Sequence, residues 1–126
     1  MAKKIFTYKG KKLEELQALP INELAQLLPS RQRRKISRGF SQEEADFIEK
    51  VKAKDNVKTH LRDMIVLPDM IGKTVKIHNG QKFESILLQP ETLGCYFGEL
   101  VLTRKRLAHS NPGVGSTRSS AHTSTR

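Results

Sequence analysis

The sequence predicts a small α+β domain, and three observations lead to this fold class. Between residues 13 and 28, leucines recur near the spacing of a helix. Between residues 75 and 78, apolar and polar side chains alternate up to Asn79-Gly80, as in a strand that enters a hairpin. From Ala108 onward the chain is rich in Ser, Thr, Gly and Pro and has almost nothing to bury, so we expect a flexible basic tail.

The first dozen residues, Met1 to Lys12, form a basic arm that is too short and too polar to fold alone. After this arm, Pro20 and Pro29 divide the leucine-rich region, because a proline is tolerated in the first turn of a helix but breaks its interior. Two short helices are therefore expected before residue 29. Pro29 opens a strongly basic stretch, Ser30 to Arg38, and Gly39 is a natural stop for it.

A further helix is predicted from about Gln42 to Lys54. Ser41 and Glu44 form the sequence pattern of a capping box, whose two reciprocal hydrogen bonds satisfy backbone donors at a helix start. Phe47 and Val51 share one face of this helix, and acidic side chains crowd its first turns, where the helix dipole favours them. This acidic helix is the element least expected to face a nucleic acid.

Beyond residue 55 the pattern changes to extended structure. Met64-Ile65-Val66-Leu67 is a short apolar run that Pro68 ends. Asn79-Gly80 is the strongest two-residue hairpin signal, because both positions of such a turn require a positive φ. The return strand is expected from about Gln81 to Leu88, after which Pro90 can open one helical turn.

The chain is strongly basic, with 23 Lys and Arg against 13 Asp and Glu and a net charge of +10. The excess lies at the two ends: residues 1–40 carry +7 and residues 101–126 carry +5, while the residues between them are nearly neutral. Such a charge is typical of a protein that neutralises phosphates. The length leaves room for one domain with a modest core, so part of its order is expected to come from a partner.

The single cysteine, Cys95, excludes an internal disulfide and a cysteine-based zinc site. We therefore expect a reducing, cytoplasmic location. Lys3 and Lys4 lead into no signal-peptide core. No apolar run approaches the roughly 18 residues that a membrane span requires, so no membrane partner is expected.

Sequence motifs for catalysis are incomplete. Gly72-Lys73-Thr74 matches the end of a phosphate-binding loop, but Leu67 stands where that motif needs a glycine. Gly113-Val114-Gly115 lacks the third glycine of a dinucleotide site. Cys95 has the character of a small buried residue more than of a nucleophile. We expect no enzymatic activity, no cofactor and no small-molecule substrate.

Metal binding is not expected either. The histidines are spaced too widely for a local metal motif: His60, His78, His109 and His122. Asp63 and Asp69 flank the apolar run and could pair as carboxylates. The favoured interpretation places Asp63 at the surface or in an ion pair and Asp69 in a turn or a helix start.

Several motifs between residues 58 and 106 occur in a definite order and spacing: Lys58-Thr59-His60-Leu61-Arg62-Asp63, Leu67-Pro68-Asp69-Met70-Ile71-Gly72, Asn79-Gly80, Gly94 with Phe97-Gly98-Glu99, and Thr103-Arg104. In these motifs the chain resembles the small-subunit ribosomal protein S19 family. The basic residues 32–39 and the segment 112–120 resemble its archaeal and eukaryotic branch. Cys95 and Leu100 stand where the family usually has His and Phe, and the last six residues lack its more apolar ending.

The resemblance implies a small mixed three-stranded sheet that includes the hairpin and packs with short helices. It implies an N-terminal extension of short helices (residues 1–57), an RNA-binding core (58–107) and a flexible tail (108–126). It also implies a structural constituent of the ribosome. Such a protein binds small-subunit ribosomal RNA in the subunit head beside the neighbouring head protein S13, and its tail approaches transfer RNA. A stand-alone RNA-binding regulator or RNA chaperone with the same fold is the alternative.

The candidate RNA-binding residues form three groups. The densest falls within eight residues: Arg31, Arg33, Arg34, Lys35 and Arg38. The second belongs to the core: Lys58, His60, Arg62, Lys73, Lys76, His78, Asn79 and Lys82. The third lies at the C-terminal end: Arg104, Lys105, Arg106, His109 and Arg118. Arginine suits this role because its guanidinium holds two phosphate oxygens or stacks on an unpaired base. A solvated cationic surface and a simply disordered tail are the alternatives.

Overall fold

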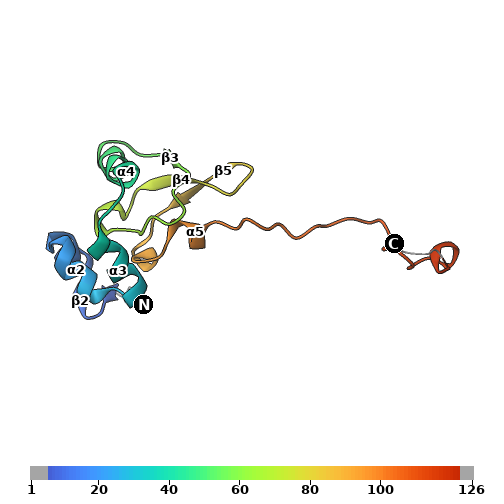
Figure 1. Ribbon diagram of the computed structural model, residues 1–126, viewed down its shortest axis with the longest axis horizontal. Coiled ribbons are helices and arrows are strands. Elements are labelled where there is room, and N and C mark those ends of the chain that lie inside the picture. Colours follow the sequence, from blue (N-terminus) through green and yellow to red (C-terminus); the bar gives the residue numbers. More distant parts are fainter. Residues whose placement is uncertain (1–5, 123–126) are drawn as a thin grey trace, which may run out of the picture.

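The computed structural model describes residues 6–122, and Figure 1 shows a folded body from which the C-terminal segment extends. The first five residues of the predicted basic arm and residues 123–126 of the final segment lie outside the described part. The α+β class is confirmed, because helices fill the first half of the chain and a mixed three-stranded sheet follows them.

A short hairpin begins the fold. Its strands, β1 (Thr7–Tyr8) and β2 (Lys11–Lys12), pair antiparallel, and Lys9 and Gly10 between them both have a positive φ. Tyr8 packs against the hydrophobic core. Residues 7–12 therefore fold against the body, which supplies the packing that so short a polar segment lacks alone.

Four helices follow: α1 (Leu13–Ala18), α2 (Ile21–Leu27), α3 (Ser30–Arg38) and α4 (Gln42–Ala53). Helices α1, α2 and α4 lie at the predicted places, and the basic stretch between Pro29 and Gly39 forms α3. Pro20 and Pro29 precede α2 and α3, and Gly39 ends α3 with a φ of 88° that glycine tolerates. The predicted capping box is present at α4. The backbone N–H of Ser41 donates to Oε2 of Glu44 at 2.9 Å, and the N–H of Glu44 donates to Oγ of Ser41 at 3.4 Å.

The three-stranded sheet has the order β3–β4–β5, and its strands are β3 (Val57–Thr59), β4 (Thr74–His78) and β5 (Phe83–Leu87). Strand β3 is parallel to β4, and β4 is antiparallel to β5. Val75 and Ile77 are fully buried, while Lys76 and His78 point to the opposite face. The alternation predicted for this strand is thus confirmed.

The predicted hairpin is present, but Asn79 and Gly80 are not its two turn positions, because the N–H of Asn79 donates to the carbonyl of Lys82 at 3.0 Å and Gly80 and Gln81 lie between them. His78 pairs with Phe83, so four residues connect the strands. Of these four, Gly80 alone has a positive φ. Oδ1 of Asn79 accepts hydrogen bonds from the backbone N–H groups of Gln81 and Lys82, both at 2.9 Å. This side-chain bonding stabilises the connection between the strands and accounts for Asn at its first position.

The apolar run Met64–Leu67 is buried completely but is not a strand of the sheet. An isolated bridge joins Ile65 to Tyr96, and the N–H of Val66 donates to the carbonyl of Cys95 at 2.9 Å. The run therefore crosses the core as a single irregular segment. A short apolar run does not reveal from its pattern alone which neighbour it pairs with.

Short helical turns complete the chain: η1 (Pro68–Met70), η2 (Pro90–Thr92), α5 (Phe97–Leu100) and η3 (Arg118–Ser120). The turn predicted at Pro90 is confirmed. Helix α5 was not predicted, because four residues give no readable periodicity. It buries Phe97 completely.

One hydrophobic core joins the N-terminal helices to the sheet. Leu28 of the helical region lies in the same buried cluster as Val75, Ile77 and Phe97. The ring of Phe47 in α4 meets that of Phe97 edge-on, with centroids 5.6 Å apart. Figure 1 shows α2 and α3 at one end of the body and the β4–β5 hairpin at the other. The basic stretch and the hairpin thus belong to one packed unit.

Replacement of Gly94 by alanine is expected to lower the free energy of unfolding by about 2 kcal/mol. Gly94 has a φ of 79°, and a Cβ atom there would lie 2.8 Å from Cδ2 of Leu28. Urea unfolding followed by circular dichroism measures the loss. Gly113→Ala is the control, because its Cβ meets open space, and it should change stability by less than about 0.5 kcal/mol. Equal effects of the two substitutions would contradict this prediction.

Candidate nucleic-acid interface

Three arginines of α3 share one face of the helix. Arg31, Arg34 and Arg38 are three and four positions apart, so the helix places them in a row. They line a hollow of about 690 Å³, which the start of α4, the loop before Met64 and the α5 region close on other sides. All three residues are exposed, and no carboxylate in residues 6–122 forms an ion pair with them. We call these three residues the arginine face.

Tyr96 forms an aromatic wall of this hollow. The guanidinium of Arg31 lies over its ring, 5.2 Å from the ring centroid. A cation–π contact orients the guanidinium without neutralising its charge. The hollow therefore presents both cations that suit phosphates and a ring that suits a base.

Arg33 belongs to the same basic stretch, but its side chain is used within the protein. It donates hydrogen bonds to the backbone carbonyls of Ala25 (3.4 Å), Gln26 (3.3 Å) and Leu28 (3.2 Å). These carbonyls lie at the C-terminal end of α2, where acceptors lack helical partners and the helix dipole favours a cation. Arg33 thus fastens α3 to α2.

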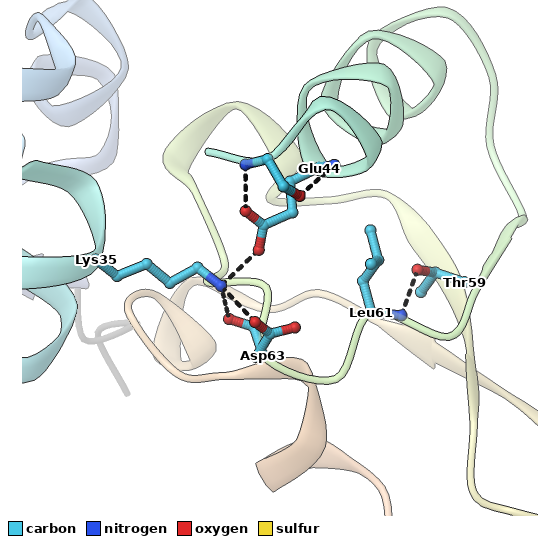
Figure 2. Close-up of polar contacts among 6 residues, drawn as sticks. Lys35, Glu44, Thr59, Leu61 and Asp63 are labelled. Carbon is cyan, nitrogen blue, oxygen red and sulfur yellow. Dashed lines mark hydrogen bonds and ion pairs between the residues drawn. The ribbon is translucent and has the colours of Figure 1, made fainter. Parts of the chain in front are cut away.

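Lys35 is held between two carboxylates, as Figure 2 shows. Its Nζ lies 2.5 Å from Oε1 of Glu44 and 2.9 Å from Oδ2 of Asp63, and it donates to the backbone carbonyl of Asp63 at 2.6 Å. Glu44 is only 4% exposed, and its second oxygen accepts the capping bond from Ser41. The ion triad of Lys35, Glu44 and Asp63 joins α3 and α4 to the loop before Met64, so it fixes three walls of the hollow.

The ion triad shifts two pKa values. Burial alone would lower the pKa of Lys35, but its hydrogen bonds to Glu44 and Asp63 outweigh burial and raise this pKa above its ordinary 10.5. The hydrogen bond from Lys35 holds the pKa of Asp63 below its ordinary 3.8. The stabilisation from Lys35 is therefore present below its unfolded pKa and is lost as the pH rises through the folded value. The stabilisation from Asp63 is present above the pKa of Asp63 in the unfolded chain. It is lost as the pH falls through the lower pKa of Asp63 in the folded protein.

Substitution of Asp63 by asparagine is expected to flatten the acid limb of the stability curve. The parent loses the Lys35–Asp63 contribution below pH 3.8, whereas the variant has none to lose, so the two free energies of unfolding should converge in acid. Urea unfolding at pH values from roughly 2 to 7 measures this convergence. Asp55→Asn is the control, since Asp55 is exposed and has no ion pair within residues 6–122. A difference that stays constant across the range would contradict the prediction.

Arg62 ties the hairpin to α5. Its guanidinium donates to the backbone carbonyls of His78 at 2.8 Å, Gly98 at 3.0 Å and Val101 at 3.3 Å. Gly98 approaches this arginine so closely that a Cβ atom there would lie 3.1 Å from the Arg62 carbonyl oxygen. Arg62 also lines the hollow, so it connects the arginine face with the end of the sheet.

Lys73 caps the acidic helix α4. Its Nζ donates to the carbonyl oxygens of Val51 at 2.5 Å and of Lys52 at 2.9 Å, which lie in the last helical turn. The lysine of the rejected phosphate-loop motif therefore has a partner inside the fold. We leave Lys73 out of the proposed interface, together with Arg33, Lys35 and Arg62, because their cationic groups are engaged by the protein.

The sheet carries the other core candidates. Four of them lie on its outward face: Lys58, His60, Lys76 and His78. Thr59 and Ile77, which alternate with them, are buried on the core side. Lys82 is exposed at the hairpin turn, and the side chain of Asn79 organises that turn.

The candidates at the C-terminal end are all exposed: Arg104, Lys105, Arg106, His109 and Arg118. Figure 1 shows their segment running away from the body. Local hydrogen bonds shape its far end, among them Oγ of Ser116 donating to the carbonyl of Gly113 at 2.6 Å. The tail cations are therefore free of the packed core.

Two aromatic residues that contact candidate cations were not identified from the sequence. Tyr96 lies under Arg31, and Phe83 lies under Lys58, whose Nζ is 5.4 Å from the ring centroid. The signal for Phe83 was the hairpin register, which places it opposite His78. Tyr96 gave no such signal, because its contact joins segments 65 residues apart.

The described residues also bear on metal binding, membrane insertion and the reactivity of Cys95. Between residues 6 and 122, no three His, Cys, Asp or Glu side chains come together as metal ligands. Within the same range, the helices are too short and too polar to cross a membrane. Burial, with Glu99 nearby, raises the pKa of the Cys95 thiol, which disfavours the reactive thiolate.

Known proteins resemble this chain over most of its length. The family model described as Ribosomal protein S19 matches residues 33–109. Three archaeal proteins named small ribosomal subunit protein uS19 align over 118 residues, or 93% of this chain. The Methanoculleus marisnigri protein is 45% identical over 86% of its own length, the Methanoregula boonei protein 47% over 85%, and the Picrophilus torridus protein 50% over 78%.

The family match includes most of the candidate interface, and Arg31 lies two residues before it. The family model covers most of α3, all of α4 and the sheet, and α5 with the start of the tail. It spans more than half of the chain, and the three relatives are well above 30% identical. The chain therefore belongs to the ribosomal protein S19 family.

Proposed function

We propose that this chain is a structural constituent of the small ribosomal subunit and binds ribosomal RNA of the subunit head through the arginine face of α3. One observation carries the proposal: three guanidinium groups stand in a row on a hollow of about 690 Å³ without a carboxylate partner in residues 6–122. The family and the names of the three relatives support a ribosomal role.

The arginine face suits a folded RNA because it is both cationic and rigidly held. Each guanidinium can bind two phosphate oxygens at once. Arg33 and the ion triad hold α3 in place before any RNA arrives, so the backbone of α3 loses little conformational freedom on binding. The chain thus offers a preformed surface to RNA.

The C-terminal segment from Arg104 onward, which includes the tail, supplies the second cationic region of the proposal. Three residues separate its exposed Arg104, Lys105 and Arg106 from the end of α5, and Arg118 lies near its far end. In this proposal the tail follows RNA away from the body and approaches transfer RNA, while the body contacts ribosomal protein S13. Both partners, the division of the chain at residues 57 and 107, and the cytoplasmic location follow from the family resemblance.

Sedimentation of small subunits tests the proposal. Lysate of the source organism is separated on a sucrose gradient, and an antibody against the chain locates it before and after a wash at moderate salt. We expect the chain in the small-subunit fractions in both cases. Its presence only in light fractions would contradict the proposal and favour a stand-alone RNA regulator or chaperone.

A further inference from the structure

We propose that the outward face of the β3–β4–β5 sheet binds a single-stranded RNA segment by stacking unpaired bases on a row of rings. This row, which we call the aromatic row, consists of His60, His78 and Phe83. The inference rests on the proposed function and deepens it, because it states which form of RNA this second surface takes and how it holds it.

The strand register creates the aromatic row. Thr59 pairs with Ile77 in the parallel ladder, so the next position along each strand sets His60 beside His78. In the antiparallel ladder, His78 pairs with Phe83. The ring that directly follows β3, the ring that ends β4 and the ring that begins β5 therefore meet at one end of the sheet. Because side chains alternate along a strand, all three point away from the buried Ile77.

The rings contact one another. The centroids of His60 and His78 are 4.6 Å apart with a tilt of 36°, those of His60 and Phe83 are 5.0 Å apart, and those of His78 and Phe83 are 4.9 Å apart. The near-perpendicular packing of Phe83 against both imidazoles limits their rotation. His60 is exposed and forms the outer ring, so the cluster is a fixed platform open to solvent.

A row of lysines lies next to the rings. Lys58 pairs with Lys76, and Lys76 with Ser85, two positions along each strand from the aromatic row and on the same face. Neither lysine has an ion pair with a carboxylate of the described chain. Glu84 belongs to the opposite face, because its register partner is the buried Ile77. The outward face thus combines rings and cations and has no carboxylate.

This combination suits a single strand better than a duplex. Stacking on a protein ring requires bases that are not stacked in a helix, while the lysines can follow the phosphates on either side. The aromatic row is also adjacent to the hollow of α3, since Arg62 lines that hollow and binds the carbonyl of His78. An unpaired segment leaving the arginine face can therefore continue directly onto the rings.

Two RNA probes of equal charge separate stacking from charge attraction. One is a fluorescent ten-nucleotide oligoadenylate, and the other is the same ribose-phosphate chain without bases. The full-length chain is titrated with each, and a matched duplex serves as a third probe. We expect the parent to bind oligoadenylate at least about tenfold more tightly than the abasic chain, since one stacked base contributes roughly that factor or more.

Variants assign this preference to the rings. Phe83→Leu removes a ring while keeping an apolar side chain and the net charge, and His60→Ala removes the outer ring. Each should reduce the preference for bases to less than about threefold. Leu87→Ala is the matched control, because Leu87 is 54% exposed on the same face but outside the row, and it should keep the preference. Lys58→Ala with Lys76→Ala should weaken binding of both probes equally.

Equal affinity of the parent for the abasic and the base-bearing chain would overturn the inference, as would a preference that survives both ring variants. Ring variants that weaken binding of the duplex as much as binding of oligoadenylate would overturn it as well. These outcomes leave the proposed function standing if the chain still sediments with small subunits. A chain that binds none of the probes and sediments only in light fractions would refute both proposals.

Discussion

Replacement of Lys35 by methionine is expected to lower the free energy of unfolding by about 3 kcal/mol, because it leaves the buried carboxylate of Glu44 without its cation. The side chain of Lys35 is 17% exposed and that of Glu44 only 6%, so water cannot replace the lost partner well. The same change frees Asp63, but its side chain is 76% exposed and remains solvated. Urea unfolding at neutral pH measures the loss.

A second variant separates the charge from the packing of Lys35. Glu44→Gln keeps an oxygen that can accept the capping bond from Ser41 but removes the buried charge. Combined with Lys35→Met, it should restore about 1 to 2 kcal/mol relative to Lys35→Met alone. Lys82→Met, at an exposed turn position, is the control for removal of a lysine. If Lys35→Met were no more destabilising than this control, the ion triad would not hold the hollow together.

Replacement of both Arg34 and Arg38 by alanine is expected to weaken binding to isolated small-subunit ribosomal RNA by roughly 40-fold at 0.1 M salt. If each arginine neutralises one phosphate, the log–log slope of affinity against salt should become shallower by roughly 1.4 to 1.8. Filter binding at several salt concentrations measures both quantities. Arg31 is left in place because it also contacts Tyr96.

The matched control removes the same charge at the same spacing. Lys50 and Lys54 are exposed and lie four positions apart at the end of the acidic helix α4, as Arg34 and Arg38 do on α3. Their replacement by alanine should reduce affinity by less than about threefold, through the change in net charge alone. Equal losses in the two double variants would remove the arginine face from the contact surface.

The helices could be predicted because their signals are local. Pro29, Gly39 and the pair Ser41 and Glu44 each act within one helical turn, and the structure places helix ends at these residues. The buried run Met64–Leu67 could not be placed, because its bridge to Tyr96 depends on chain folding over a distance of about 30 residues. The hairpin was confirmed, but the side-chain bonding of Asn79 decided the type of turn.

The sequence predicted which basic residues lie in the candidate interface, but it did not predict which of them bind other parts of the protein. The sequence showed five cations in α3, and helical spacing alone would group Arg31, Arg34 and Arg38. It could not show that Arg33 binds the end of α2 or that Lys35 binds Glu44, because those partners are set by tertiary packing. The sequence-based set was therefore larger than the set of cations that remain free for RNA.

A structure of the chain bound within a small ribosomal subunit tests the central claim most directly. We expect RNA phosphate oxygens within hydrogen-bond distance, about 3 Å, of the guanidinium groups of Arg34 and Arg38 in the hollow of α3. Phosphates near the tail but solvent or protein in this hollow would contradict the claim that the arginine face binds ribosomal RNA.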